Sequence, residues 1–322
     1  FENLSGMKYF GTADLKDAYH RFPIERESQF KCSFSFNGQG FYFLKACFGL
    51  CQLPSQYQFT LSTLLSGLQQ VRDETGRIVS TTQNFLDDII IAGVNFEHYK
   101  VAVKTVIDRL TEAKLILQSS KCHFMQKKVR LLGFVVDEKG IRVDKSKCTN
   151  VANWPVPTTK KQVQQFMGLV NYLRSHIPMI YRVAAPITDL IKDNKDVMKH
   201  WTNKHTECFE AIKKILQADL LINYPDFEKE FIIACDASLY GVAAVIYQED
   251  DKGRHKYVGF ISSTLSPAQR RWSTTKRELY AVVLALKKFH TYIYGRTFRV
   301  LTDHRALVYL HSQKVVNPMM AG

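Results

Sequence analysis

The chain has 322 residues, of which 46% are hydrophobic and 23% are charged. This is the composition of a globular protein long enough for two or three domains, each with its own core. No apolar run approaches the roughly 20 residues of a membrane-spanning helix, and the start carries no signal-peptide pattern. Lysine and arginine exceed aspartate and glutamate by 44 to 30, a formal charge of +14. This excess suits a polyanion such as nucleic acid, although an ordinary basic surface also explains it.

The seven cysteines form no C-x-x-C pair, and their number is odd. This usage predicts reduced thiols in an intracellular protein, in preference to a disulfide framework or a zinc site. His200, His205 and Cys208 lie close together along the chain. Because no second cysteine pair follows them, we interpret this stretch as the start of a surface helix and not as a metal site.

The first part of the chain predicts mixed helix and strand. Two aromatic-rich runs, 30–36 and 40–46, flank an Asn-Gly dipeptide, which is a strong hairpin signal. A helix is predicted over 54–70, because proline at position 54 suits a first helical turn. A second helix is predicted over 96–117, and 129–143 predicts two strands around a turn. The apolar face of the second helix would carry Val103, Ile107, Leu110, Lys114 and Leu117.

The rest of the chain changes character twice. Residues 144–222 predict a small helical subdomain, in which a helix begins at Thr158 or Thr159 after the break at 154–159. Residues 223–322 predict three strands, a helix over 273–293 and a fourth strand. The apolar stripe of that helix would consist of Leu279, Val282, Val283 and Leu286.

Two adjacent aspartates, Asp87 and Asp88, interrupt the apolar run "NFLDDIIIA". Two flanking strands would place both at the tip of a hairpin, which avoids the cost of burying isolated carboxylates. One interpretation is an ordinary polar turn. The other is a pair of oxygen ligands for Mg²⁺, to which Asp14 at the end of another strand would add a third. The second interpretation predicts nucleotidyl or phosphoryl transfer.

An ordered series of motifs resembles a known family. The runs "ADLKDAYHRF", "ACFGLCQLPSQYQ", "FLDDIIIAG" and "SSKCHFMQKKVRLLGFVV" resemble successive palm motifs of a reverse transcriptase. "FMGLVNYLRSHIP" resembles the thumb, and the segments around "IIACDASLYGVAAVIYQ" and "STTKRELYAVVLALKKFHTYIYGRTFRVLTDHRAL" resemble an RNase H. The chain is similar throughout to the reverse transcriptase/RNase H region of a gypsy-type LTR retrotransposon polyprotein. The resemblance implies an α+β multidomain fold: a palm with partial fingers (1–143), a helical thumb or connection (144–222) and a truncated RNase H-like α/β domain (223–322).

The resemblance also implies roles for residues of the palm. Asp14, Asp87 and Asp88 would hold two Mg²⁺ ions, with Mn²⁺ as an alternative. Tyr19 would lie under the sugar of the incoming nucleotide and exclude a ribose 2′-hydroxyl by steric clash. The remaining residues would bind nucleotide, template or primer: Phe48, Gly49 and Pro54 around the nucleotide and template, Lys121 near the pyrophosphate, and Leu132, Gly133 and Phe134 in a turn that grips the primer end.

In the second half, Asp236, Glu278 and Asp303 match three acids of an RNase H site that binds two further Mg²⁺ ions. Two of them end apolar strands and Glu278 flanks the stripe of the predicted helix, so a common cluster is geometrically sensible. The implied partners are an RNA template, a DNA primer, an RNA–DNA hybrid and deoxynucleoside triphosphates, without a membrane. The implied location is an intracellular particle in the cytoplasm or the nucleus.

Two features depart from the family pattern and leave a second hypothesis open. Only about a dozen residues precede Asp14, where the family has most of its fingers, and the chain ends at Gly322, before the family's fourth RNase H acid and last helix. "LCQLPSQYQ" also replaces the more usual "LTNAPATFQ". The chain is therefore expected to be either an active polymerase with linked RNase H or a truncated or host-adopted remnant that binds nucleic acid without catalysis. An unrelated metal-dependent nuclease would require the order of the motifs to be coincidence.

Overall fold

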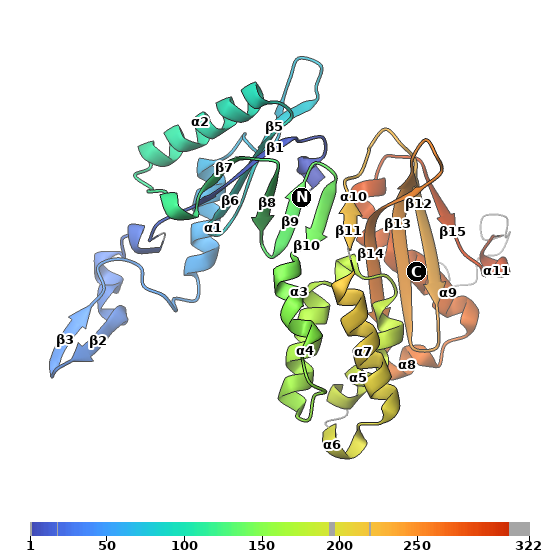
Figure 1. Cartoon of the computed structure of the whole chain (residues 1–322). Helices are drawn as coiled ribbons and strands as arrows, with labels where there is room; N and C mark the ends of the chain where they lie inside the picture. The colour runs from blue at the N-terminus through green and yellow to red at the C-terminus, as the bar shows by residue number, and fades with distance from the viewer. Residues whose placement is uncertain (1, 18, 193–196, 219, 309–322) are drawn as a thin grey trace. The chain divides into compact units, whose positions relative to one another are not determined.

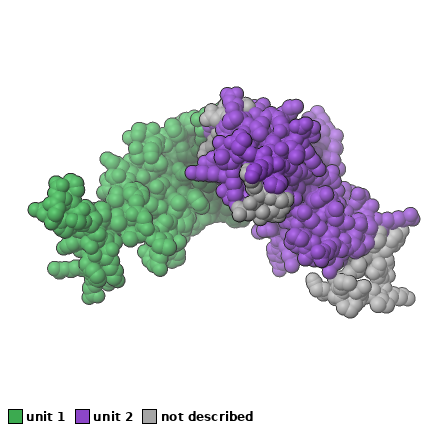
Figure 2. All heavy atoms as spheres, turned by 90° about the horizontal axis from the view of Figure 1, so that it is seen from below, with its two compact units in different colours: residues 1–140 green, residues 141–322 purple. Residues whose placement is uncertain are grey.

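The computed structural model describes residues 2–17, 19–192, 197–218 and 220–308 (Figure 1). The chain forms two compact units, Phe1–Gly140 and Ile141–Gly322, here called unit 1 and unit 2 (Figure 2). Within the described ranges no helix has the length and apolar character needed to cross a membrane. Mixed helices and sheets occur in both units, so the predicted α+β class is confirmed.

The centre of unit 1 is an antiparallel sheet whose strands are ordered β4-β5-β6-β1-β7. Every second residue of a strand faces the same side, so Ile89 and Ile91 of β6 lie on the side covered by two helices. There they pack with Tyr57 of α1 and Val106 of α2 in one core. The bounds are β1 Tyr9–Asp14, β4 Val71–Arg72, β5 Ile78–Phe85, β6 Asp88–Gly93, β7 His123–Gln126, α1 Leu53–Leu64 and α2 Phe96–Glu112. Short 3₁₀ turns occur at η1 Glu2–Leu4, η2 Tyr19–Arg21, η3 Arg26–Cys32 and η4 Ser119–Lys121.

Helix α2 is present as predicted, but it ends earlier and buries a different face. Asn95 caps its start with a side chain that accepts a hydrogen bond from the His98 amide, and the helix ends at Glu112. Its buried residues are Tyr99, Ala102, Val106 and Leu110, so the predicted face was wrong by about one residue. The reason is a close contact: Tyr99 packs so tightly on Gly93 that a Cβ there would lie 2.6 Å from the Tyr99 nitrogen. This contact fixes which side of the helix meets the sheet.

The hairpin of β2 (Ser33–Phe36) and β3 (Gln39–Tyr42) is confirmed. Its turn residues Asn37 and Gly38 both have positive φ, 50° and 76°, as a two-residue type I′ turn requires. Both strands are exposed along their whole length. The aromatic side chains that face solvent here are Phe30, Phe34, Phe36, Phe41 and Tyr42.

Three strands, and not the predicted two, lie between residues 128 and 143. They are β8 (Lys128–Leu131), β9 (Phe134–Asp137) and β10 (Gly140–Val143). The additional turn falls at Leu132 and Gly133, where φ is 48° and 75°. These left-handed values reverse the chain within a run that reads as one apolar strand.

Unit 2 contains a helical segment followed by a second sheet. Thr159 begins α4 with a capping box to Gln162, so the predicted start is confirmed. Thr202 and His205 form the corresponding box of α7, which explains His205 as a capping residue. The helices are α3 Lys145–Ala152, α4 Lys160–Tyr172, α5 Ile180–Lys192, α6 Val197–His200 and α7 Asn203–Gln217, with η5 Arg174–His176. Helix α5 contacts α7 as well as strands β13 and β14.

The sheet of unit 2 has the strand order β14-β13-β12-β15. Strands β12 and β15 are parallel and the other neighbours are antiparallel. The bounds are β12 Phe231–Ala237, β13 Gly241–Glu249, β14 His255–Thr264, β15 Phe298–Leu301, α8 Pro267–Arg270, α9 Thr274–Lys288, α10 His290–Ile293 and α11 Arg305–Val308. Strand β11 (Leu221–Asn223) neighbours β10. The predicted division at residue 222 stays a prediction.

Helix α9 packs on β12 and β13 with a face that differs from the predicted one. Its buried residues are Glu278, Ala281 and Ala285, whereas the larger predicted residues at 279, 282, 283 and 286 are only half-buried. Small alanine side chains let the helix approach the sheet closely. As a result Glu278 lies on the face of α9 that packs against the sheet, and not at the edge of that face as predicted.

Candidate active site

Three aspartates of unit 1 meet at one end of its sheet. Strand β1 runs antiparallel to β6, and their register places Asp14 directly opposite Asp88. The hairpin of β5 and β6 pairs Phe85 with Asp88, which leaves Leu86 and Asp87 as its two turn residues. The expected convergence of the three acids is therefore present, from strands separated by more than seventy residues of sequence.

The three carboxylates concentrate negative charge at this end of the sheet, which the ion pair of Asp14 with Lys121 offsets only in part. Reduced contact with water, followed by the charge of Asp14, raises the pKa of both Asp87 and Asp88 above the usual value. Asp87 Oδ1 is buried and has no hydrogen-bond partner among the described residues. The nearest positive charge is Lys121, whose Nζ lies 3.5 Å from Asp14 Oδ1. Because such an oxygen is costly to bury unpaired, the arrangement favours a bound cation.

Gln58 of α1, which the sequence did not single out, holds the turn that carries Asp87. Its Oε1 accepts a hydrogen bond of 2.6 Å from the Leu86 amide, and its Nε2 donates to the Asn84 carbonyl at 3.2 Å. Leu86 has a φ of 49°, a left-handed conformation that a branched side chain rarely adopts. The two bonds span the turn and compensate this strain. A glutamine beside the buried face of a helix gives no signal of this role in the sequence.

Of the predicted nucleotide-binding residues in this part of unit 1, Tyr19, Phe48 and Gly49 form one group, and Pro54 stands apart from them. Tyr19 lies near the acids: burial, followed by the charge of Asp87, raises the pKa of its hydroxyl. Its ring packs edge-on against Phe48 at 5.6 Å between centroids, and Phe48 is 75% exposed. Gly49 follows with a φ of 96°, which favours glycine. Pro54 lies in the first turn of α1 and is exposed, and no described contact joins it to the acids.

The predicted primer-contacting turn also lies beside the aspartates. A pocket of about 110 Å³ is lined by Asp88 and Phe85 from one side and by Leu132 from the other. The turn itself consists of Leu132 and Gly133, whereas Phe134 is the first residue of β9 and is only 8% exposed. Leu132 and Gly133 are therefore available at the surface near Asp88, and Phe134 supports them from the interior.

A second acidic cluster forms in unit 2. The parallel pairing of β12 and β15 matches Ala234 with Leu301, and continuing this register brings Asp236 beside Asp303. Glu278 of α9 faces the same strand ends and is only 5% exposed. Burial first, then the charges of Asp303 and Asp236, raises its pKa to about 7. Glu278 Oε2 is buried and has no hydrogen-bond partner among the described residues.

Asp236 is already engaged by two neighbouring residues of α5. The Tyr181 hydroxyl donates to Asp236 Oδ2 at 3.0 Å, and Arg182 Nη2 donates to both carboxylate oxygens at 2.9 and 2.8 Å. No sequence pattern indicates this contact, because it joins segments that are more than fifty residues apart. Across the described parts of both units, no group of three or more His, Cys, Asp or Glu side chains has an arrangement that could hold a metal ion as the side chains stand.

Comparison with known proteins matches both halves of the chain. The family described as "Reverse transcriptase (RNA-dependent DNA polymerase)" matches residues 1–136, and that described as "RNase H-like domain found in reverse transcriptase" matches 201–300. The Transposon Tf2-3 polyprotein of Schizosaccharomyces pombe is 31% identical over 307 residues, 95% of this chain and 22% of that polyprotein. The Retrovirus-related Pol polyprotein from transposon 297 of Drosophila melanogaster is 31% identical over 311 residues, 97% of this chain and 28% of the relative.

Solved structures agree on the fold. The foamy viral protease-reverse transcriptase in complex with RNA/DNA hybrid has a TM-score of 0.77 at 21% identity, covering 99% of this chain and 43% of that one. The same viral protein in complex with dsDNA has a TM-score of 0.79, also at 21% identity, covering 96% of this chain and 62% of that one. The gypsy-type subgroup stays a prediction. The chain belongs to the reverse transcriptases of LTR retrotransposons, and it is homologous to the part of their Pol polyproteins in which a reverse transcriptase domain is joined to an RNase H-like domain.

Proposed function

We propose that this chain is an RNA-directed DNA polymerase with a linked RNase H activity. The observation that carries the proposal is the direct pairing of Asp14 with Asp88 next to Asp87 at the hairpin tip. The chain spans 22 to 28% of the polyproteins to which it is related, so the activities of the whole polyprotein are also proposals. Its partners would be an RNA template, a DNA primer, the resulting RNA–DNA hybrid and deoxynucleoside triphosphates, inside the cell in a particle or in the nucleus.

The residues at both acidic clusters fit divalent metal ions. Carboxylate oxygens are the ligands that Mg²⁺ prefers, and each cluster holds a buried oxygen without a partner, on Asp87 and on Glu278. Asp14, Asp87 and Asp88 would hold two Mg²⁺ or Mn²⁺ ions in unit 1, and Asp236, Glu278 and Asp303 would hold two in unit 2. Such ions, when bound, supply charge stabilisation for the attacking and leaving oxygens of a phosphoryl displacement.

The chain's own residues would orient the substrates around these acids. Lys121, 59% exposed beside Asp14, would meet the negative charge of the departing pyrophosphate. Tyr19, fixed by its ring contacts with Phe48 and Tyr57, would present a ring edge to the sugar and exclude a 2′-hydroxyl. The half-buried turn of Leu132 and Gly133 would hold the primer end beside Asp88.

In unit 2 Glu278 is suited to act as a metal ligand. Its pKa of about 7 in the metal-free chain reflects burial and then the charges of Asp303 and Asp236. A divalent cation bound among these acids would favour the ionised form of Glu278, which is the form that can act as a ligand. Asp236 and Asp303, at the ends of neighbouring strands, would complete the set of carboxylates that holds the ions.

Primer extension by the chain itself tests the polymerase proposal. We expect a DNA primer on an RNA template to be lengthened in Mg²⁺ and not in EDTA, with binding of the same duplex measured in parallel. Tight binding without extension would contradict the proposal. It would favour instead a remnant that grips nucleic acid through its net charge of +14, with an affinity that falls steeply with salt.

The contact between Gln58 and the turn gives a more specific prediction. Gln58→Ala removes both hydrogen bonds that span Leu86, so Asp87 should lose its fixed position. We expect kcat for nucleotide incorporation to fall about 10- to 100-fold, because small misplacements of catalytic groups are costly, with KM little changed. Faster hydrogen exchange at the Leu86 amide would show the loosened turn directly. The control is Gln56→Ala, an exposed glutamine of the same helix; equal effects of the two variants would contradict the role of Gln58.

The raised pKa of Glu278 predicts how stability depends on pH in the metal-free chain. The folded state favours protonated Glu278, so this stabilisation is complete below pH 4.5 and is lost as the pH rises through about 7. Glu278→Gln cannot ionise and should keep it. At about pH 8 in EDTA, we expect the variant to exceed the parent by about 3 kcal/mol in free energy of unfolding, and to match it below about pH 4. Urea denaturation at both pH values measures this. The exposed Glu228→Gln should show no such pH dependence.

A further inference from the structure

The Asp236 carboxylate is the centre of a compact set of contacts from α5. Besides its bonds to Asp236, Arg182 donates from Nε to the Tyr181 hydroxyl at 3.2 Å. The tyrosine backbone is itself fixed, because its amide donates to Ser262 Oγ at 3.0 Å. Both oxygens of Asp236 are thus hydrogen-bonded, and a full positive charge lies against them at 2.8 Å. A guanidinium in this position neutralises the carboxylate and repels a second cation.

The two α5 residues differ in how firmly they are held. Tyr181 is 1% exposed, and its ring packs on β13 so closely that a Cβ on Gly241 would lie 2.4 Å from it. Tyr181 therefore keeps Asp236 in one orientation permanently. The Arg182 side chain is 51% exposed, and ion pairs at such positions contribute little to stability. It can leave Asp236 without disturbing the core.

We propose that Arg182 is a gate on the metal site of unit 2, holding Asp236 closed until a divalent cation displaces the guanidinium. The inference rests on the proposed RNase H function and adds its regulation. Tyr181 keeps the carboxylate oriented whether or not a cation is bound. Arg182 contacts Asp236 only in the closed state, before a cation has displaced it. The gate lowers the affinity of the site for metal, so the nuclease centre fills only when the free cation concentration overcomes the ion pair.

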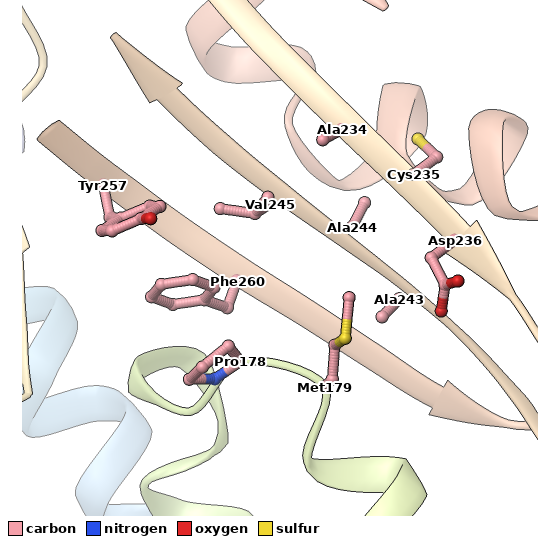
Figure 3. A pocket seen from close by; sticks show the side chains of 10 residues that line it. All are labelled: Pro178, Met179, Ala234, Cys235, Asp236, Ala243, Ala244, Val245, Tyr257 and Phe260. Carbon is pink, nitrogen blue, oxygen red and sulfur yellow. The ribbon is translucent and has the colours of Figure 1, made fainter. Parts of the chain in front are cut away.

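The structure also provides space for the open state. Arg182 lines a pocket of about 440 Å³ between α5, α7 and the turn before β13, and Asp189 of α5 lines the same pocket. Asp189 is 37% exposed and pairs with Arg270 at 3.3 Å, and Lys204 of α7 also lines the pocket. A released guanidinium would therefore have one acidic and one basic neighbour there. On the sheet side, Asp236 ends an apolar pocket of about 290 Å³ bordered by Pro178 and Met179 (Figure 3). That pocket offers no carboxylate besides Asp236, so Arg182 would move toward α7.

Binding of Mn²⁺ to the full chain tests the gate without measuring catalysis. The background is Asp87→Asn with Asp88→Asn, which weakens the metal site proposed in unit 1. Electron paramagnetic resonance of free Mn²⁺ gives the affinity of the remaining site. We expect Arg182→Ala to tighten binding about three- to tenfold, the range of a well-aligned ion pair. Arg182→Lys keeps the charge but loses the contact of Nη2 with both carboxylate oxygens, so it should lie between the parent and the alanine variant.

The matched control is Arg299→Ala, which breaks an equally exposed arginine pair, Arg299 with Glu230 at 2.8 Å, on β15 of the same sheet. It should leave Mn²⁺ affinity unchanged. Equal or weaker affinity in Arg182→Ala, with the fold intact by circular dichroism, overturns the gate alone. Adding Asp303→Asn should weaken the binding markedly. Mn²⁺ binding that ignores Asp303, or is absent throughout, overturns the proposed nuclease site and the gate together.

Discussion

Asp87→Asn should reduce RNA-templated DNA synthesis by at least about 10³-fold, because it removes one charge from the centre that would stabilise the transition state. The amide has nearly the shape of the carboxylate, so the β5–β6 hairpin and its bond from Leu86 to Gln58 should persist. Single-nucleotide incorporation under pre-steady-state conditions measures the loss. Binding of primer–template should change far less than incorporation does.

The control for this prediction is Asp108→Asn on α2. That acid is half exposed and pairs with Lys104 in an exposed i,i+4 contact, so the variant makes the same change of charge at a solvent-exposed helix position. Its effect on incorporation should be small. Polymerase activity that survives in Asp87→Asn would contradict the assignment of the unit 1 acids, even if the parent chain extends primers.

Gly93→Ala should unfold unit 1 or come close to it. A Cβ at this position would lie 2.6 to 2.8 Å from three atoms of Tyr99, two of which are backbone atoms that cannot rotate away. Helix α2 would have to move off β6, with loss of the core contacts of Tyr99. We expect a loss of more than about 3 kcal/mol in the free energy of unfolding. Urea denaturation followed by hydrogen exchange of unit 1 peptides measures it.

Gly40→Ala is the matched control in the same unit. A Cβ on Gly40 would meet nothing within 4 Å, and the strand that carries it is exposed. Its effect should stay within about 0.5 kcal/mol, as is usual for surface substitutions. If the two alanine variants were equally stable, the tight contact between β6 and α2 would not be what fixes the helix on the sheet.

Local signals predicted much of this fold from the sequence. The Asn37-Gly38 turn, the cap at Thr159 and the order of strands and helix after residue 231 depend on short-range chemistry, and all three are confirmed. The convergence of Asp14 with Asp87 and Asp88 was also predictable, because each acid follows or interrupts an apolar strand. Their roles in catalysis stay predictions until activity is measured.

The errors have a common physical cause in tertiary packing. Periodicity predicted which helices are amphipathic, but the face that is buried depends on what each helix meets. The close contact of Gly93 with Tyr99 determines which face of α2 meets the sheet. In α9, the small side chains of Ala281 and Ala285 let the face that carries Glu278 pack against the sheet. The contacts of Gln58 and Arg182 join distant segments, and neither residue type is unusual where it stands. No pattern within a single sequence could have predicted them.

The register between β1 and β6 has a consequence for inherited variation. Residues 89–92 lie between Asp88 and the close contact at Gly93, and most of their apolar side chains could be exchanged for others of similar size. Their number could not change, because loss of one residue would turn Asp88 to the opposite face of the sheet from Asp14. Among diverging copies of a retrotransposon, the number of residues in this segment should therefore matter more than their types. A change in that number should mark copies that can no longer replicate.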